Sequence, residues 1–212
     1  MHRGAGGLRQ IALGAAIVMF GAMQSAAQDA DPAEDLMPLP SFADCMNEEA
    51  ARYERALRAA QGMSTPQKFE IGDTRGTGYC GSVGFVLCDR KGDLARVQNC
   101  QSLFALEQDV LASKVRAGLP VPDALGETGT DVERELYQRL YALAHGSSAG
   151  PDCAGDIPQR RTWCTAWEAN NRLSNAILAW QLARFLGAAE PAVVAGWAET
   201  PPPQRPQARA TD

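Results

Sequence analysis

Six cysteines are the residues of this 212-residue chain whose chemistry constrains it most: Cys45, Cys80, Cys88, Cys100, Cys153 and Cys164. Thiols form disulfides, bind metals or act as nucleophiles, depending on their neighbours and their compartment. An even cysteine count behind an export signal is typical of a disulfide framework. We therefore treat all six as disulfide candidates, although six cysteines allow fifteen complete pairings and their order does not choose among them.

Metal binding explains the cysteines less well than disulfide formation does. The sequence has no C-x-x-C pair, and beyond the export signal His145 is the one histidine. Structural zinc sites take four cysteine or histidine ligands, usually grouped at short spacings. We therefore predict no metal site and no cofactor.

A third use of cysteine is nucleophilic catalysis by Cys80. The segment 79–85 resembles the nucleophile segment of cell-wall cysteine peptidases, in which a helix N-terminus lowers the pKa of the cysteine. Such enzymes also need a histidine base. The one candidate is His145, which ends a predicted helix just before Gly146 and lacks the strand setting that such folds provide. A cysteine hydrolase is therefore kept as the third functional hypothesis.

The first 27 residues have the three parts of an export signal. A positive start precedes an apolar stretch and small residues at a cleavage site, namely His2, Arg3 and Arg9, then Ile11 to Met23, then Ser25, Ala26 and Ala27. The apolar stretch is shorter than the about 20 residues that a spanning helix needs. We predict cleavage before Gln28, a periplasmic or secreted location, and no membrane span after signal cleavage.

The charge balance argues against one large class of partners. The formal net charge is −5, and loss of Arg3 and Arg9 with the signal would change it to −7. Phosphate backbones are bound by basic surfaces, so we expect no nucleic-acid partner. An acidic surface is compatible with a basic protein partner, although acidic charge also serves solubility.

The spacing of apolar residues predicts a mainly α fold, a small disulfide-stapled helical bundle with long loops. Helices are expected over 41–62, 79–88, 99–117, 130–146 and 158–186, with a further short helix over 191–197. For the short apolar element 79–88, a helix is favoured over a strand. Thr130 and Glu133 form a capping box, and Pro158 and Gly187 suit the first position and the end of the last long helix.

This pattern divides the chain into four parts. Residues 1–27 are the signal peptide, 28–40 a disordered leader, 41–187 the helical disulfide-rich domain, and 188–212 a short helix with a proline-rich disordered tail. A mature chain of about 185 residues suits one compact domain.

The same spacing assigns faces to the helices. On the first helix, Glu48 with Arg52 and Glu54 with Arg58 are i,i+4 pairs that suit a solvated face. The predicted apolar stripes are Phe42, Met46, Tyr53, Leu57 and Ala60 on the first helix, Leu103, Leu106, Val110 and Leu111 on helix 99–117, and Leu136, Leu140 and Leu143 beside Tyr137 and Tyr141 on helix 130–146.

Cys80 and Cys88 lie eight residues apart within one predicted helix. A continuous helix separates such Cα atoms by about 12 Å along its axis, whereas a disulfide requires about 7 Å or less. If the helix is unbroken, each cysteine therefore links it to another element. Gly81 and Gly84 leave the alternative open, because a break there would permit direct pairing.

The cysteine pattern also carries a family resemblance. The first half of the LprI-like lysozyme-inhibitor domain is similar to Cys80-Gly81, Cys88, Cys100 and the helical Asp109-Val110-Leu111. Its second half is similar to Arg161, Trp163, Cys164 and Trp167, with Cys153 nearby. The resemblance runs from Tyr79 to Gly187 with gaps. The family's Trp-Asp pair is Gln108-Asp109 here, the order of arginine, tryptophan and cysteine in the last helix differs, and Cys45 lies outside the match.

Four residues are candidate partner contacts: Arg75, Asp109, Trp167 and Arg172. Arg75 lies in a glycine-rich segment without the Lys-Ser/Thr ending of a phosphate loop. Asp109 lies on the acidic helix of the family resemblance. Trp167 and Arg172 flank a polar interruption of the last helix. Tryptophan and arginine are common interface anchors, although we expect the tryptophans to be mainly core residues.

The resemblance implies a small exported domain that binds protein and is not an enzyme. The leading hypothesis is therefore a protein-binding module that inhibits lysozyme or a related cell-wall lytic enzyme, with its acidic surface in the basic cleft of the target. The alternative is a structural or scaffold protein of the cell envelope without inhibitory activity.

Overall fold

The computed structural model describes residues 39–64, 69, 75–146, 153–155 and 157–201. Within these ranges the chain forms five α-helices, two short 3-10 segments and no strand. They are α1 (Phe42–Gln61), α2 (Arg75–Asp89), α3 (Leu94–Ala117), η1 (Pro122–Leu125), α4 (Asp131–His145), η2 (Cys153–Gly155) and α5 (Pro158–Phe185). The predicted mainly α fold is confirmed. The predicted signal peptide, the leader up to residue 38 and the tail from residue 202 lie outside the described residues.

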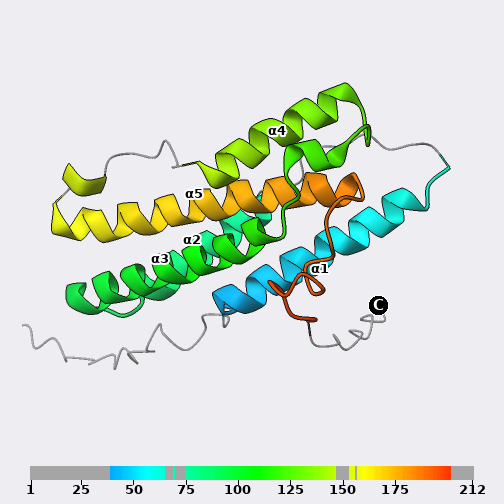
Figure 1. The fold of residues 1–212 in the computed structure, drawn as a ribbon. Coiled ribbons are helices and arrows are strands. Elements are labelled where there is room, and N and C mark those ends of the chain that lie inside the picture. Colours follow the sequence, from blue (N-terminus) through cyan, green and yellow to red (C-terminus); the bar gives the residue numbers. More distant parts are fainter. Residues whose placement is uncertain (1–38, 65–68, 70–74, 147–152, 156, 202–212) are drawn as a thin grey trace, which may run out of the picture. The chain divides into compact units, whose positions relative to one another are not determined.

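Helix α5 is the central element of the bundle. Figure 1 shows α4 along one side of α5 and α3 along the other, and α2 also packs against it. Alanines let these neighbours approach closely, and large apolar side chains fill the spaces between them. The buried residues of α5 include Ala166, Ala169, Leu173, Ala176, Ile177, Ala179, Trp180, Leu182 and Ala183.

Glycines on α2 serve close packing rather than a break in the helix. A Cβ atom at Gly84 would lie 2.2 Å from the ring of Phe104, and one at Gly81 would lie 2.4 Å from Oδ1 of Asn170. Phe104 in turn makes edge contacts with Phe42 on α1 and Phe85 on α2, at centroid distances of 5.1 and 5.5 Å. Because α2 is continuous through both glycines, the alternative of direct Cys80–Cys88 pairing is wrong.

All six cysteines form disulfides. Cys45–Cys80 links α1 to α2, Cys88–Cys100 links α2 to α3, and Cys153–Cys164 links η2 to α5. The Cα atoms of each pair lie 5.3 to 5.6 Å apart. Cys80 and Cys88 therefore each attach α2 to a different helix, as the spacing on an unbroken helix predicts.

The predicted caps are present on the last two helices. Thr130 Oγ1 accepts a hydrogen bond from Glu133 N, while Glu133 Oε2 accepts one from Thr130 N at 2.8 Å. Burial acts to raise the pKa of Glu133, but hydrogen bonds from Thr130 and from Phe69 N outweigh it, and the pKa is lowered. Pro158 opens α5, and Gly187 follows it with a φ of 72° that favours glycine.

Helix α2 begins at Arg75 rather than at residue 79, and two further predictions are also wrong. Helix α3 begins at Leu94 rather than near Asn99, because Asp93 caps it by accepting a hydrogen bond from Arg96 N at 3.0 Å. The short helix predicted over 191–197 is instead a series of turns. Residue 195 still bonds back to Pro191, but Ala198 N bonds to the carbonyl of Ala192, which closes a wider turn.

We call residues 188–201 the C-terminal strap, because this segment returns from α5 to α1. Trp197 packs edge-on against Trp180 at a centroid distance of 4.8 Å. Trp180 Nε1 donates to the carbonyl of Glu190, and Glu199 N donates to Oδ1 of Asn47 at 2.9 Å. The strap is therefore tied to both helices.

No helix in the described ranges is long and apolar enough to cross a membrane.

Candidate functional site

Asp109 and Arg172, two of the predicted partner contacts, bind each other. Arg172 on α5 donates two hydrogen bonds to the Asp109 carboxylate on α3, at 2.8 and 2.9 Å. On the same helix, the Glu168 carboxylate lies 3.9 Å from the Arg172 guanidinium. The hydrogen bonds to Asp109 raise the pKa of Arg172. This pair therefore joins α3 to α5 across the bundle. The third predicted contact, Arg75, is the first residue of α2, and its side chain lies outside the described part.

Trp167 lies on a different side of α5 from Arg172. They are five positions apart, and at about 100° per residue their side chains leave the helix about 140° apart. Trp167 instead stacks on Trp163 with ring centroids 5.7 Å apart and planes 10° from parallel. The ring centroid of Phe85 on α2 lies 6.0 Å from that of Trp163 and 5.8 Å from that of Trp167. We call Trp163 and Trp167 the tryptophan pair.

The tryptophan pair is exposed, whereas the other two tryptophans belong to the core. Trp163 and Trp167 are 43% and 38% exposed, while Trp180 and Trp197 are buried. The expectation that tryptophans are mainly core residues therefore holds for only half of them. The sequence carries a signal for this difference, since Arg160 and Arg161 precede Trp163 and apolar residues surround Trp180.

The predicted buried stripe of α3 is wrong for three of its four residues. Leu103, Leu106 and Val110 are 59%, 62% and 57% exposed, whereas Leu111 is partly buried and packs against the core. We call Leu103, Leu106 and Val110 the outer stripe of α3. The buried face lies opposite and consists of Gln101, Phe104, Ala105, Gln108, Ala112 and Val115.

Two glutamines explain this reversal of α3. Gln108 Nε2 donates to the carbonyl of Ala166 at 3.0 Å, and Gln101 Oε1 accepts from the hydroxyl of Thr162 at 2.9 Å. These bonds to α5 satisfy Gln108 Nε2 and Gln101 Oε1, which would otherwise be costly to bury, while the buried Gln108 Oε1 has no hydrogen-bond partner among the described residues. On α4 the predicted Leu143 is likewise exposed, and Tyr137 and Ala144 are buried beside Leu140.

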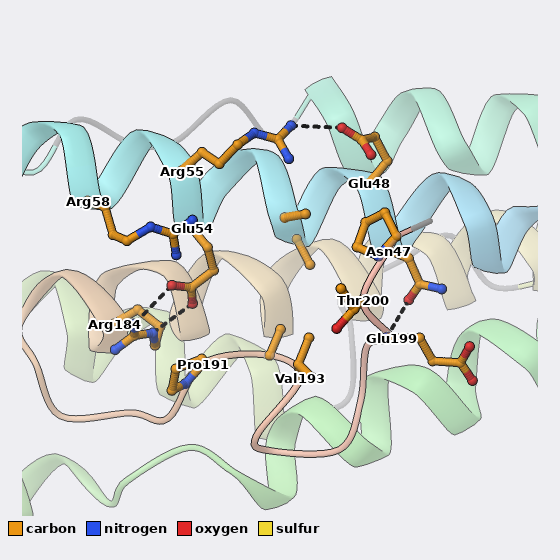
Figure 2. Close-up of a pocket in the computed structure, with 14 residues that line it drawn as sticks. Asn47, Glu48, Glu54, Arg55, Arg58, Arg184, Pro191, Val193, Glu199 and Thr200 are labelled. Atoms are coloured by element: carbon orange, nitrogen blue, oxygen red, sulfur yellow. Dashed lines mark hydrogen bonds and ion pairs between the residues drawn. The ribbon is translucent and has the colours of Figure 1, made fainter. Parts of the chain in front are cut away.

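A groove of about 910 Å³ lies between α1 and the C-terminal strap. Figure 2 shows α1 and its charged side chains on one side and Pro191 and Val193 of the strap on the other. The lining is Asn47, Glu48, Ala50, Ala51, Glu54, Arg55, Arg58, Arg184, Pro191, Ala192, Val193, Glu199, Thr200 and Pro201. The sequence did not point to this groove, because it forms only when the strap folds back on α1.

The ion pairs of the groove differ from the predicted i,i+4 pairs. Glu54 is buried and binds Arg184 of α5 through two hydrogen bonds of 2.9 Å, rather than Arg58. Glu48 binds Arg55 at 2.8 Å, rather than Arg52, which binds Glu49. Both predicted pairs are therefore wrong.

Arg184 and Tyr53 form further hydrogen bonds beside the groove and have shifted pKa values. The hydrogen bonds to Glu54 raise the pKa of Arg184, and Arg184 also donates to the carbonyl of Ala189 at 3.0 Å. Burial, and then the charge of Glu54, raise the pKa of Tyr53. The Tyr53 hydroxyl donates to the carbonyl of Gln181.

Two charged side chains of the groove, Arg58 and Glu199, have no ion-pair or hydrogen-bond partner among the described residues. Figure 2 shows the Arg58 guanidinium turned toward the Glu54–Arg184 pair, and Glu199 near the other end of the strap. The Arg58 guanidinium thus lies beside a carboxylate that is already paired, while the Glu199 side chain points away from the groove (Figure 2).

The hypothesis of nucleophilic catalysis by Cys80 requires a free thiol, and all six cysteines are in disulfides. Cys80 is bonded to Cys45 and fully buried, so its sulfur is not free to attack a substrate. The candidate base His145 stacks on Tyr141 at the exposed end of α4. Across the described ranges, no three histidine, cysteine, aspartate or glutamate side chains are grouped so as to hold a metal ion.

Comparison of the chain with family models, with curated proteins and with solved structures finds no significant match. The resemblance to the LprI-like domain therefore rests on the sequence pattern alone.

Proposed function

We propose that this chain is an exported, non-catalytic protein-binding module, and that its target is lysozyme or a related cell-wall lytic enzyme. The observation that carries the binding role is the exposed tryptophan pair. The identity of the target comes from the family resemblance and the acidic charge.

The tryptophan pair has the properties of an interface anchor. Tryptophan buries a large area at low entropic cost and is enriched among residues that dominate binding energy. The Trp163 and Trp167 rings are held parallel and rest on Phe85. The Cys153–Cys164 disulfide ties down the first turns of α5, from which both side chains project. A partner would therefore meet a preorganised apolar surface.

The charge of the chain favours a basic partner. A formal net charge of −5, which becomes −7 when Arg3 and Arg9 are removed with the signal, attracts a cationic enzyme and speeds the encounter, an effect that weakens as salt increases. Disulfide bonds are typical of proteins that fold in an oxidising compartment, which agrees with a periplasmic or secreted location.

The test is a titration of the mature chain, beginning at Gln28, with a basic lysozyme at low and moderate salt. Calorimetry measures binding, and clearing of a cell-wall suspension measures inhibition. We expect binding that weakens with salt, and a loss of at least about tenfold in the Trp163→Ala/Trp167→Ala double variant, equal to about 1.4 kcal/mol. Val132→Ala is the control, because Val132 is an exposed apolar residue of α4.

Absence of binding at both salt concentrations would remove lysozyme as the target. Unchanged affinity in the double variant would remove the tryptophan pair as the anchor. A scaffold protein without inhibitory activity would then be the better hypothesis. A reactive thiol at Cys80 in protein purified from an oxidising compartment would instead revive the cysteine hydrolase.

A further inference from the structure

Two buried polar atoms, one on the C-terminal strap and one on α5, lack a hydrogen-bond partner. Trp197 of the strap is 6% exposed, and Gln181 of α5 is 8% exposed. Neither Trp197 Nε1 nor Gln181 Oε1 is hydrogen-bonded to any residue that the structure describes. Native proteins supply a partner for most buried polar groups, because leaving one unsatisfied is costly. The pair therefore needs a partner of another kind.

Both residues line one small cavity between α1, the start of α2, α5 and the strap. Its volume is about 10 Å³, and its polar lining also includes Tyr53 of α1 and Thr77 of α2. A cavity needs about 10 to 15 Å³ to hold one water molecule. This cavity therefore has room for one water molecule and for no larger ligand.

Trp197 also lines a hollow of about 300 Å³ between α1, α3 and the strap, but Gln181 does not. Of these two spaces, only the small cavity is lined by both residues with an unpartnered atom. A single group that serves both atoms therefore lies in the small cavity.

The two atoms need opposite kinds of hydrogen bond, and this identifies the ligand. Trp197 Nε1 can only donate, whereas Gln181 Oε1 can only accept. A metal or ammonium ion would bind the amide oxygen but leave the indole N–H unpaired, and an anion would do the reverse. A water molecule accepts from the indole and donates to the amide.

We propose that the cavity is a binding site for one water molecule that joins Trp197 of the strap to Gln181 of α5. The water accepts a hydrogen bond from Trp197 Nε1 and donates one to Gln181 Oε1. Its second proton is donated to the hydroxyl oxygen of Tyr53, whose own proton is donated to the carbonyl of Gln181. This gives the water three bonds, the usual number for a buried water.

The water adds a polar link to the ring contact between Trp197 and Trp180. The strap is thereby tied to α5 through a side chain in its own middle, and not only at Glu190 and Glu199. The site is separate from the partner-binding role of the tryptophan pair. Trp167 precedes Gln181 by fourteen positions of α5, or about 21 Å along the helix.

The direct test uses the isotopically labelled mature chain, and the probe is water itself. Nuclear Overhauser spectra in the laboratory and rotating frames distinguish a held water molecule from bulk water and from exchange of the indole proton. We expect a cross-peak between water and the Trp197 indole proton, with the signs of a long-lived water. Gln181→Met keeps the side-chain length but removes the acceptor, so the cross-peak should be lost. Gln138→Met, at an exposed position of α4, is the matched control and should keep it.

A double-mutant cycle measures the same link through stability. Trp197→Phe removes the donor and Gln181→Met removes the acceptor, and each change alone leaves the other side chain with an incomplete partner. In urea denaturation we expect the double variant to lose less stability than the two single variants lose together. The difference should be at least about threefold in the unfolding equilibrium constant. Circular dichroism checks that each variant is folded.

Three results would overturn the proposal. The first is the lack of a long-lived water cross-peak at the Trp197 indole in the wild type, which needs no variant to fold. The second is a cross-peak that survives unchanged in Gln181→Met, since Gln181 would then not hold the water. The third is additive loss of stability in the cycle. Coupling in the cycle without a water cross-peak would show instead that the two side chains bond directly.

Discussion

Glu54 and Arg184 form two hydrogen bonds of 2.9 Å across 130 positions of the chain, and they join α1 to the end of α5. Both side chains are largely shielded from water. Removing one partner of such a pair leaves the other charge without compensation, which costs more than the pair itself contributes.

We therefore expect Glu54→Ala to lower the free energy of unfolding by about 3 kcal/mol. Urea denaturation measures the change. Glu135→Ala breaks the exposed pair with Arg139 on α4 and should cost less than about 0.5 kcal/mol. Equal costs in the two variants would show that the Glu54–Arg184 pair is solvated in solution.

The glycines of α2 give a second prediction. Gly84→Ala would place a Cβ atom 2.2 Å from the Phe104 ring, so the core must shift. We expect a loss of about 1 to 3 kcal/mol in urea denaturation. In Gly78→Ala, on the same helix, the new Cβ meets no atom within 4 Å, and the better helix propensity of alanine should stabilise by about 0.5 to 1 kcal/mol. Stabilisation by both substitutions would contradict the packing described here.

The capping box of α4 predicts a pH dependence. Because the pKa of Glu133 is lowered in the folded protein, its ionised form contributes stability above the unfolded pKa of about 4.3. That contribution is lost as the pH falls through the folded pKa. Glutamine at this position keeps the capping geometry but does not titrate. The stability difference between wild type and Glu133→Gln should therefore shrink below about pH 4, and thermal melts from pH 7 to pH 3 measure it.

The three disulfides should contribute unequally. Cys45–Cys80 closes a loop with a sequence separation of 35, and Cys153–Cys164 one with a separation of 11. Loop entropy assigns about 4 kcal/mol to the first and about 3 kcal/mol to the second. We expect the double alanine variant of the first pair to be the less stable in urea, more so because Cys80 is fully buried. The reverse order would mean that residual structure in the unfolded chain already holds α1 near α2.

Local signals in the sequence predicted the helices better than they predicted the faces of the helices. Thr130, Pro158 and Gly187 act on their own backbone, so their caps could be predicted from neighbours alone. The buried face of α3 could not, because Gln101 and Gln108 become suitable core residues only when α5 supplies their hydrogen-bond partners.

The candidate sites show the same limit. Trp167, one of the predicted partner contacts, is exposed. Asp109 and Arg172, two others, bind each other, and this pairing could not be predicted because they lie far apart in the sequence. No local pattern in the sequence indicates the groove, because it depends on the strap folding back on α1. The i,i+4 spacing pairs Glu54 with Arg58, whereas in the structure Glu54 binds Arg184 near the end of α5.

The strap also decides how the helical unit would respond to mechanical load. Pro40, before α1, and Pro201, at the end of the strap, line one shared hollow, so these two points of the chain lie close together. A force pulling these two points apart would first act on the contact between Glu199 and Asn47. The strap would peel away from α1 before tension reached α5, while the covalent link between Cys45 and Cys80 kept α1 fastened to α2.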